Sequence, residues 1–120
     1  SIAPGLPGEA QGWYEYGISQ TPSGPQVYRW LTMQGAATGS VTAASLSVTR
    51  DEVNKTTSYS LTLPWSELTP IVAQAGGVLS FSLAVNDNDG AGRKGYIEWG
   101  SGIGGAKDST LFRSVVLMPD

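Results

Sequence analysis

Residues 78–99, with the sequence VLSFSLAVNDNDGAGRKGYIEW, decide the fold. A period of two along the first part of this stretch predicts a half-buried strand. Its outward face would carry Ser80 and Ser82, and its core face the apolar residues Leu79, Phe81, Leu83 and Val85. Residues 86–90, NDNDG, predict a turn, because these residue types bond to their own backbone or tolerate positive φ. A second strand then completes the stretch.

The rest of the chain repeats this alternation of short strands and turns. Residues 1–12 are rich in Gly and Pro and predict an irregular lead-in, while PWSEL at residues 64–68 predicts a single helical turn. Residues 32–42 predict a loop. Residues 13–120 are therefore predicted to form a single all-β domain, an antiparallel β-sandwich of about seven strands. The predicted strands are residues 13–20, 26–31, 43–49, 58–63, 78–86, 95–99 and 111–118.

The composition limits the kinds of function that this chain can have. Its 120 residues include 16 Gly and 7 Pro, and only 14 % are charged, which is typical of a β domain with many turns. The net charge of −3 gives no basis for a nucleic-acid partner or an anionic membrane surface, so we expect neither. The absence of Cys and His excludes disulfides, His-ligated or thiolate metal sites and His-dependent catalytic triads.

Carboxylates are the remaining candidates for hydrolytic chemistry. A glycosidase needs two of them facing each other across a cleft. Glu15 and Glu98 are the strand-borne residues that could supply such a pair, with Glu67 at a corner. This is a weak basis for an enzyme, and we expect the chain to have no catalytic residues.

Several motifs together resemble family 9 carbohydrate-binding modules. The stretch YSLTLPWSEL at residues 59–68 is similar to a strand that ends in a Pro-Trp-x-x-Leu corner in that family. Residues 76–112, GGVLSFSLAVNDNDGAGRKGYIEWGSGIGGAKDSTLF, resemble its Val-Asn-Asp strand, Arg-x-Gly exit, strand-terminal Trp and Asp-x-x-x-Phe closing segment. The upstream segments WYEYGISQ and GPQVYRW fit as well, so the resemblance covers nearly the whole chain.

This resemblance implies a jelly-roll-like β-sandwich that binds polysaccharide or oligosaccharide without catalysing a reaction. Such a module would serve a secreted or cell-surface bacterial protein that acts on glycans, either a glycoside hydrolase or a polysaccharide lyase. Whole modules of the family are longer, and the chain matches their C-terminal two thirds. We therefore expect a larger polypeptide and a sandwich that is incomplete without an N-terminal segment or an adjacent domain, unless another strand order closes its edge.

Sugar recognition needs aromatic faces for the C–H side of a ring and planar polar groups for its hydroxyls. The predicted ligand-binding residues are Arg93, Trp13, Glu15, Trp30 and Asn86. The resemblance aligns Arg93 with a polar contact of the family, but residues 103–107 lack the aromatic that would stack on the sugar. The alternative is a structural or interdomain interaction module that kept the fold and lost its sugar site.

Asp87 and Asp89 carry the hard oxygen ligands that calcium prefers. Family members often hold structural calcium, so the resemblance implies a calcium ion as the cofactor that this turn could bind. The alternative is a turn capped by its own side chains.

Overall fold

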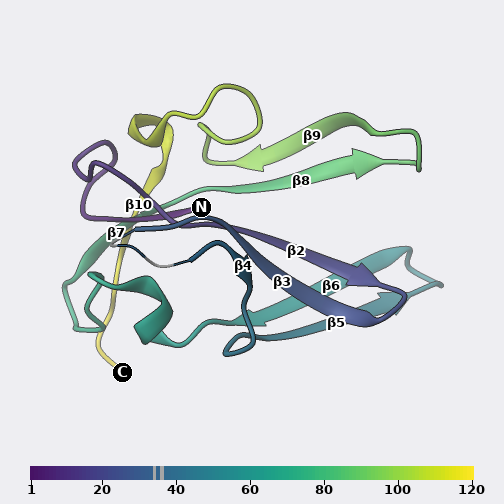
Figure 1. Ribbon diagram of the computed structural model, residues 1–120, viewed down its shortest axis with the longest axis horizontal. Helices are drawn as coiled ribbons and strands as arrows, with labels where there is room; N and C mark the ends of the chain where they lie inside the picture. The colour runs from purple at the N-terminus through teal and green to yellow at the C-terminus, as the bar shows by residue number, and fades with distance from the viewer. Residues whose placement is uncertain (34, 36) are drawn as a thin grey trace. The chain divides into compact units, whose positions relative to one another are not determined.

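The structure is a computed structural model that describes residues 1–33, 35 and 37–120. These residues form ten β-strands and two short 3₁₀ helices, and every strand pairing among them is antiparallel (Figure 1). The predicted all-β antiparallel class is confirmed, and the set of sheets is consistent with a β-sandwich. The strands are β1 (Ile2–Pro4), β2 (Glu15–Thr21), β3 (Gly24–Leu31), β4 (Gly39–Ser40), β5 (Ser45–Asp51), β6 (Thr56–Thr62), β7 (Val78–Phe81), β8 (Leu83–Asn88), β9 (Arg93–Trp99) and β10 (Arg113–Val116), and the helices are η1 (Trp65–Leu68) and η2 (Ser109–Leu111).

The chain divides into two compact units. The central unit is Tyr14–Thr69, and the terminal unit joins Ser1–Trp13 to Pro70–Asp120. The terminal unit thus includes the predicted lead-in, residues 1–12. That lead-in is not wholly irregular, because β1 lies within it and pairs with β7. The prediction that residues 13–120 form one domain stays a prediction.

The central unit contains a sheet with the order β2-β3-β4 and a ribbon made of β5 and β6. A two-residue turn joins β2 to β3, because Thr21 pairs directly with Gly24. The turn between β5 and β6 is capped by Asp51, whose Oδ1 accepts hydrogen bonds from the amides of Val53 and Asn54 at 2.9 and 3.0 Å. The predicted loop at residues 32–42 contains β4, while residues 34 and 36 of that prediction lie outside the described residues.

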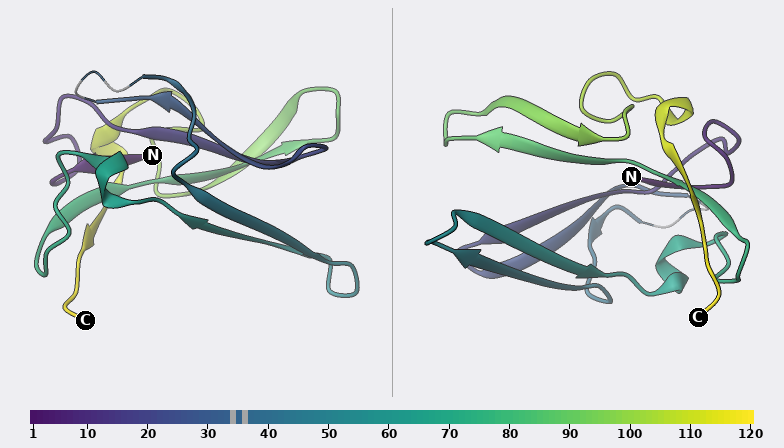
Figure 2. Two further views of the ribbon diagram at one scale, coloured as in Figure 1. Left: turned by 60° about the horizontal axis from the view of Figure 1, so that its bottom comes forward. Right: turned by 180° about the vertical axis from the view of Figure 1, so that it is seen from behind.

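The terminal unit contains a sheet with the order β1-β7-β10 and a ribbon made of β8 and β9. Both views in Figure 2 show β8 and β9 running side by side up to their connecting turn. This turn matches the prediction from the NDNDG run, since the Asn88 side chain accepts a hydrogen bond from the Gly90 amide at 2.8 Å. After β9 comes the glycine-rich loop, residues 100–108. Its last residue, Asp108, is the N-cap of the 3₁₀ helix η2, and its side chain accepts from the Thr110 amide at 3.0 Å.

Burial along β7 and β8 differs from the predicted alternation. Ser80 and Ser82, which we expected on the outer face, are completely buried, whereas Leu83 and Val85 are about half exposed. The predicted core face holds for Leu79, which is buried, but the predicted outer face was wrong, because both faces of β7 are covered. β7 is the middle strand of its sheet, and the small residues Ala3, Ser80 and Ser114 lie in a row across the three strands. The strand predicted at residues 78–86 is also two strands, β7 and β8, which belong to different sheets. Period-two alternation therefore does not show whether the polar face of a strand is exposed.

The ribbon of β5 and β6 leaves large apolar side chains open to solvent. Tyr59 and Leu61, two residues apart on β6, are 50 % and 37 % exposed. A two-stranded ribbon buries a face only when another layer covers it. The buried apolar side chains of the central unit lie elsewhere, at Tyr14, Val27, Val41 and Leu68, and those of the terminal unit are Ala3, Leu79 and Phe112.

Candidate functional site

Two neighbouring aromatic rings stand exposed on β3 in the central unit. The ring centroids of Tyr28 and Trp30 are 4.4 Å apart, and their planes are inclined by 45°. Tyr28 is 38 % exposed and Trp30 58 % exposed. We call this pair the aromatic platform. Large aromatic surface left open to solvent is unusual for a packing role and is a common feature of ligand-binding surfaces.

An irregularity in the strand pairing displays the Trp30 side chain. Glu15 pairs with Leu31 and Tyr16 pairs with Arg29, so Trp30 is the extra residue of a β-bulge and has no Cα partner on β2. Bulges re-aim side chains and often occur beside functional sites. The indole lies over Gly17, because a Cβ atom at that position would be only 2.5 Å from the Trp30 Nε1.

Small, uncharged polar residues flank Tyr28 on the open face of the sheet. Ser40 on β4 lies directly opposite Tyr28, and Gln26 precedes Tyr28 by two residues on β3. Ser19 on β2 lies opposite Gln26. Directly opposed residues and residues two apart share one face of a sheet, so these three side chains flank the aromatic rings, and all three are exposed. The face offers hydroxyl and amide groups for hydrogen bonds and no charge from these positions.

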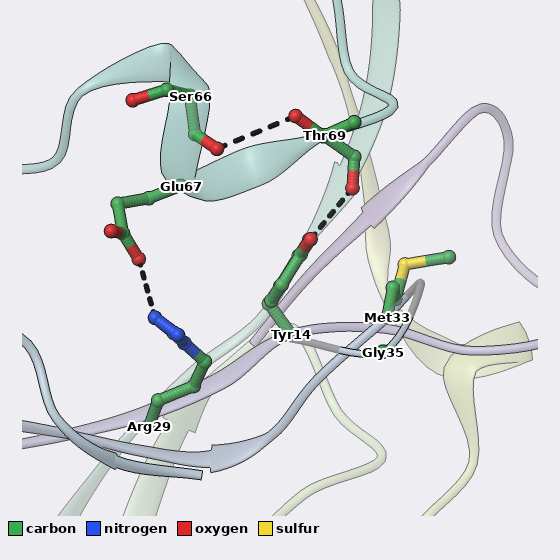
Figure 3. Close-up of a pocket in the computed structure, with 7 residues that line it drawn as sticks. All are labelled: Tyr14, Arg29, Met33, Gly35, Ser66, Glu67 and Thr69. Atoms are coloured by element: carbon green, nitrogen blue, oxygen red, sulfur yellow. Dashed lines mark hydrogen bonds and ion pairs between the residues drawn. The ribbon is translucent and has the colours of Figure 1, made fainter. Parts of the chain in front are cut away.

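The opposite face of β3 carries an ion pair beside a cavity of about 340 Å³. Arg29 and Glu67 both line this cavity and point toward one another, with their closest N and O atoms 2.8 Å apart (Figure 3). Arg29 also donates to the Ala37 carbonyl at 3.1 Å. The residues lining the cavity are Tyr14, Arg29, Met33, Gly35, Ser66, Glu67 and Thr69.

The groups beside this cavity bond mainly to each other. Figure 3 shows the Tyr14 hydroxyl directed at the Thr69 carbonyl, to which it donates at 2.7 Å. The Tyr16 hydroxyl donates to the Glu67 carbonyl at 3.1 Å. Burial raises the pKa of Tyr16 to about 12, with the nearby Arg29 charge opposing that rise. The arrangement fastens η1 to the β2-β3 sheet by tyrosine hydroxyls and an ion pair, and so its role is structural.

Arg93 was predicted to bind a ligand, and the structure gives its guanidinium three partners inside the terminal unit. It donates to the Gly104 carbonyl at 2.8 Å and to the Asn86 side chain at 3.4 Å. Its Cζ lies 4.8 Å from the centroid of the Tyr96 ring, a cation–π arrangement. The Glu98 carboxylate accepts a hydrogen bond from the Gly104 amide. Arg93 and Glu98 therefore bind the carbonyl and the amide of the same residue, Gly104, in the glycine-rich loop of residues 100–108.

The remaining predicted ligand residues fall into both units. Trp13 belongs to the terminal unit, where its half-buried ring packs edge-to-face on Phe112 with centroids 5.8 Å apart. Glu15 is the first residue of β2 in the central unit and is half-buried. Two of the five predicted residues, Asn86 and Arg93, are hydrogen-bonded to each other. Of the five predicted residues, Trp30 is the one whose side chain is both aromatic and widely exposed.

Tyr28 is a residue of this candidate site that the sequence analysis missed. A signal was present, since Tyr28 and Trp30 are two apart in a predicted strand and therefore share a face. What the sequence did not show was which face of β3 is covered. Val27, on the other parity, is buried, and this leaves the two aromatics on the open side.

The two carboxylates predicted as calcium ligands lie at the end of the ribbon of β8 and β9. Asp87 is exposed on β8, and Asp89 forms an ion pair with Lys94 at 2.5 Å. Among residues 1–33, 35 and 37–120, no three metal-ligating side chains come close enough together to hold a metal ion. A calcium ion at this turn stays a prediction.

The helices in the described part of the chain are too short and too polar for any of them to cross a membrane. Comparisons with protein-family models, curated proteins and solved structures give no match to this chain. The resemblance to family 9 carbohydrate-binding modules therefore stays a prediction, and functional proposals rest on the geometry of the two units.

Proposed function

We propose that this protein is a non-catalytic carbohydrate-binding domain whose binding surface is the aromatic platform. The observation that carries the proposal is the exposed pair of Tyr28 and Trp30, of which Trp30 is 58 % exposed. Small polar side chains flank the pair on the same face of the sheet. Sugar rings present C–H groups on their faces and hydroxyls around their rims. An aromatic face meets the first requirement, and the neighbouring hydroxyl and amide groups meet the second.

The chemistry of the surrounding residues favours a sugar without charge. Ser19, Gln26 and Ser40 can each donate and accept hydrogen bonds with hydroxyl groups, and none of them is ionisable. An acidic sugar would instead be recognised through Arg or Lys. Arg29, the strand residue between Tyr28 and Trp30, lies on the opposite face in its ion pair with Glu67.

In the larger polypeptide, the domain would hold a glycan-active bacterial enzyme at its substrate. We propose a glycoside hydrolase or polysaccharide lyase that is secreted or displayed at the cell surface, with polysaccharide as the partner of this domain. A tethered module raises the effective concentration of an attached catalytic domain at the glycan. Calcium at Asp87 and Asp89, in the terminal unit, would be structural in this proposal.

Isothermal titration with neutral hexaoses of glucose, xylose and mannose tests this proposal. The wild-type protein is expected to bind at least one of them, and Trp30→Ala and Tyr28→Ala are each expected to weaken binding about tenfold or more. Tyr59→Ala is the matched control, because Tyr59 is also an exposed aromatic of the central unit but stands on β6. Equal loss of binding in all three variants, or no binding by the wild type, would contradict the proposal.

A second candidate is an interdomain interaction module, and one observation favours it. Leu83 pairs with Trp99 and Val85 with Ile97, so four apolar side chains share one face of the β8 and β9 ribbon. All four are exposed, Ile97 by 73 %. In this case no glycan would bind. Amide exchange across β8 and β9 would then be slower in the parent polypeptide than in the isolated chain, whereas the first candidate predicts equal rates.

A further inference from the structure

Gly17 stands out among the strand glycines because an aromatic ring occupies the space that its side chain would fill. Its φ lies outside the left-handed region that favours glycine, and it sits in the middle of β2. Glycine in a strand interior weakens the strand and often marks a place where another group approaches closely. The group that approaches Gly17 is the indole of Trp30.

The contact between these two residues is specific to one part of the indole. A Cβ atom at position 17 would lie 2.5 Å from Trp30 Nε1, which is closer than real Cβ atoms come, and 3.3 Å from Cδ1, which is a tight contact. The far end of a side chain can move away, so an alanine at this position is accommodated by displacing the ring rather than by breaking the sheet. The direct strand partner of Gly17 is Tyr28, the other ring of the platform.

We infer that Gly17 is the positioning residue of the binding surface: its missing side chain lets the Trp30 indole lie against β2 beside Tyr28. This inference rests on the proposed function. Gly17 itself contacts the Trp30 ring and is not assigned a contact with the sugar. A side chain at position 17 lifts the indole and separates the two rings, whose centroids are 4.4 Å apart in the structure.

The experiment compares Gly17→Ala with Gly95→Ala. Gly95 is the matched control, since it is also a strand glycine without positive φ, and a Cβ atom there would meet nothing within 4 Å. The first readout needs no sugar: it is the indole N–H resonance of Trp30 in the free protein, assigned by its disappearance in Trp30→Phe. The second is the affinity for whichever neutral hexaose binds the wild type, and thermal unfolding checks that each variant folds.

The inference predicts that Gly17→Ala moves the Trp30 resonance and weakens hexaose binding about tenfold, with no fall in the unfolding temperature. Gly95→Ala should change neither. An unmoved Trp30 resonance in Gly17→Ala would overturn the positioning role, even if the wild type binds sugar. A moved resonance in a protein that binds no hexaose would support the positioning role and overturn the proposed function, so the two failures are distinguishable. Gly17→Ser provides a second test of the same displacement.

Discussion

Arg93 is held at the start of β9 by contacts within its own unit. It donates to the Gly104 carbonyl, and Glu98 accepts the amide of the same residue. The sequence predicted Arg93 as a ligand-binding residue, whereas in the structure it donates to a backbone carbonyl eleven residues away. No side-chain pattern identifies such a partner.

Replacing Arg93 with Ala should loosen the glycine-rich loop. The loss of a charge-assisted hydrogen bond at this partly buried site is expected to cost about 1 kcal/mol locally and to speed exchange of the Gly104 amide about fivefold. Hydrogen exchange measures this directly. Lys94→Ala is the control, because the ion pair of Lys94 with Asp89 is exposed and contributes little. Equal exchange rates of the Gly104 amide in the wild type and in Arg93→Ala would show that Arg93 does not hold the loop.

Asp51 should contribute to stability in a pH-dependent way. Hydrogen bonds from the Asn54 amide and side chain, and from the Val53 amide, lower the pKa of Asp51 from 3.8. Because the folded pKa is depressed, the contribution is present above the unfolded pKa and is lost as the pH falls through the folded one. Asp51→Ala is therefore expected to lower the unfolding temperature at pH 7.

The difference in unfolding temperature between wild type and Asp51→Ala should shrink progressively as the pH is lowered below about 4. Asp87→Ala, which changes an exposed carboxylate of the terminal unit, serves for comparison. A difference of the same size at pH 7 and at pH 2 would show that the Asp51 carboxylate does not act through its ionised form.

At the scale of elements, β7 shows where alternation is informative and where it is not. The period-two pattern predicts a strand that begins at Val78, but neither its end at Phe81 nor the burial of both of its faces. Ser80 has no exposed surface, and its Oγ has no hydrogen-bond partner within the described residues. A buried hydroxyl without a partner contributes nothing that alanine would not. Small volume is therefore what position 80 requires.

Ser80→Leu should destabilise the protein by about 1–3 kcal/mol, because extra methylenes overpack a filled site. Ser80→Ala should be neutral or slightly stabilising. Denaturant unfolding gives both values. Ser47→Leu, on the exposed face of β5, is the control and should change stability by less than about 0.5 kcal/mol. If Ser80→Leu did not lower the free energy of unfolding, Ser80 would face outward, as the sequence alone predicted.

The packing of η1 on β2 should make the central unit sensitive to high pH. Burial raises the pKa of Tyr16 to about 12, above the usual value of 10.0. The neutral hydroxyl contributes to the free energy of unfolding, and this contribution is complete below pH 10 and is lost as the pH rises toward 12. Its size is roughly 1 kcal/mol once solvent screening of the half-buried ring is allowed for.

Tyr16→Phe should flatten this alkaline fall in unfolding free energy, as measured by urea unfolding between pH 9 and 12. The variant also loses the hydrogen bond to the Glu67 carbonyl, so its stability at pH 8 is expected to be lower by about 1 kcal/mol. Tyr59→Phe changes an exposed tyrosine of the same unit and should keep the wild-type profile. An unchanged alkaline profile in Tyr16→Phe would rule out Tyr16 as its source.

At the scale of the molecule, the sequence predicted the class, the turns and most of the strands, because each of these depends on local pattern. The single strand predicted at residues 78–86 is instead two strands, β7 and β8, which belong to different sheets. The sequence also missed β1 and β4, which are two or three residues long and are strands only because a distant partner pairs with them. For the same reason the sequence predicted only part of the candidate site. Trp30 was predicted from its residue type, whereas Tyr28 and Gly17 were not, because their roles depend on the register between β2 and β3.

The central claim, that Tyr28 and Trp30 form a carbohydrate-binding surface, is tested most directly by an NMR titration of the wild-type protein with neutral hexaoses. The chain has four tryptophans, so four indole N–H signals report on four places at once. The account predicts that the Trp30 signal shifts saturably with at least one hexaose, while those of Trp13, Trp65 and Trp99 stay in place. No indole shift with any hexaose, or a shift confined to the other three tryptophans, would contradict it.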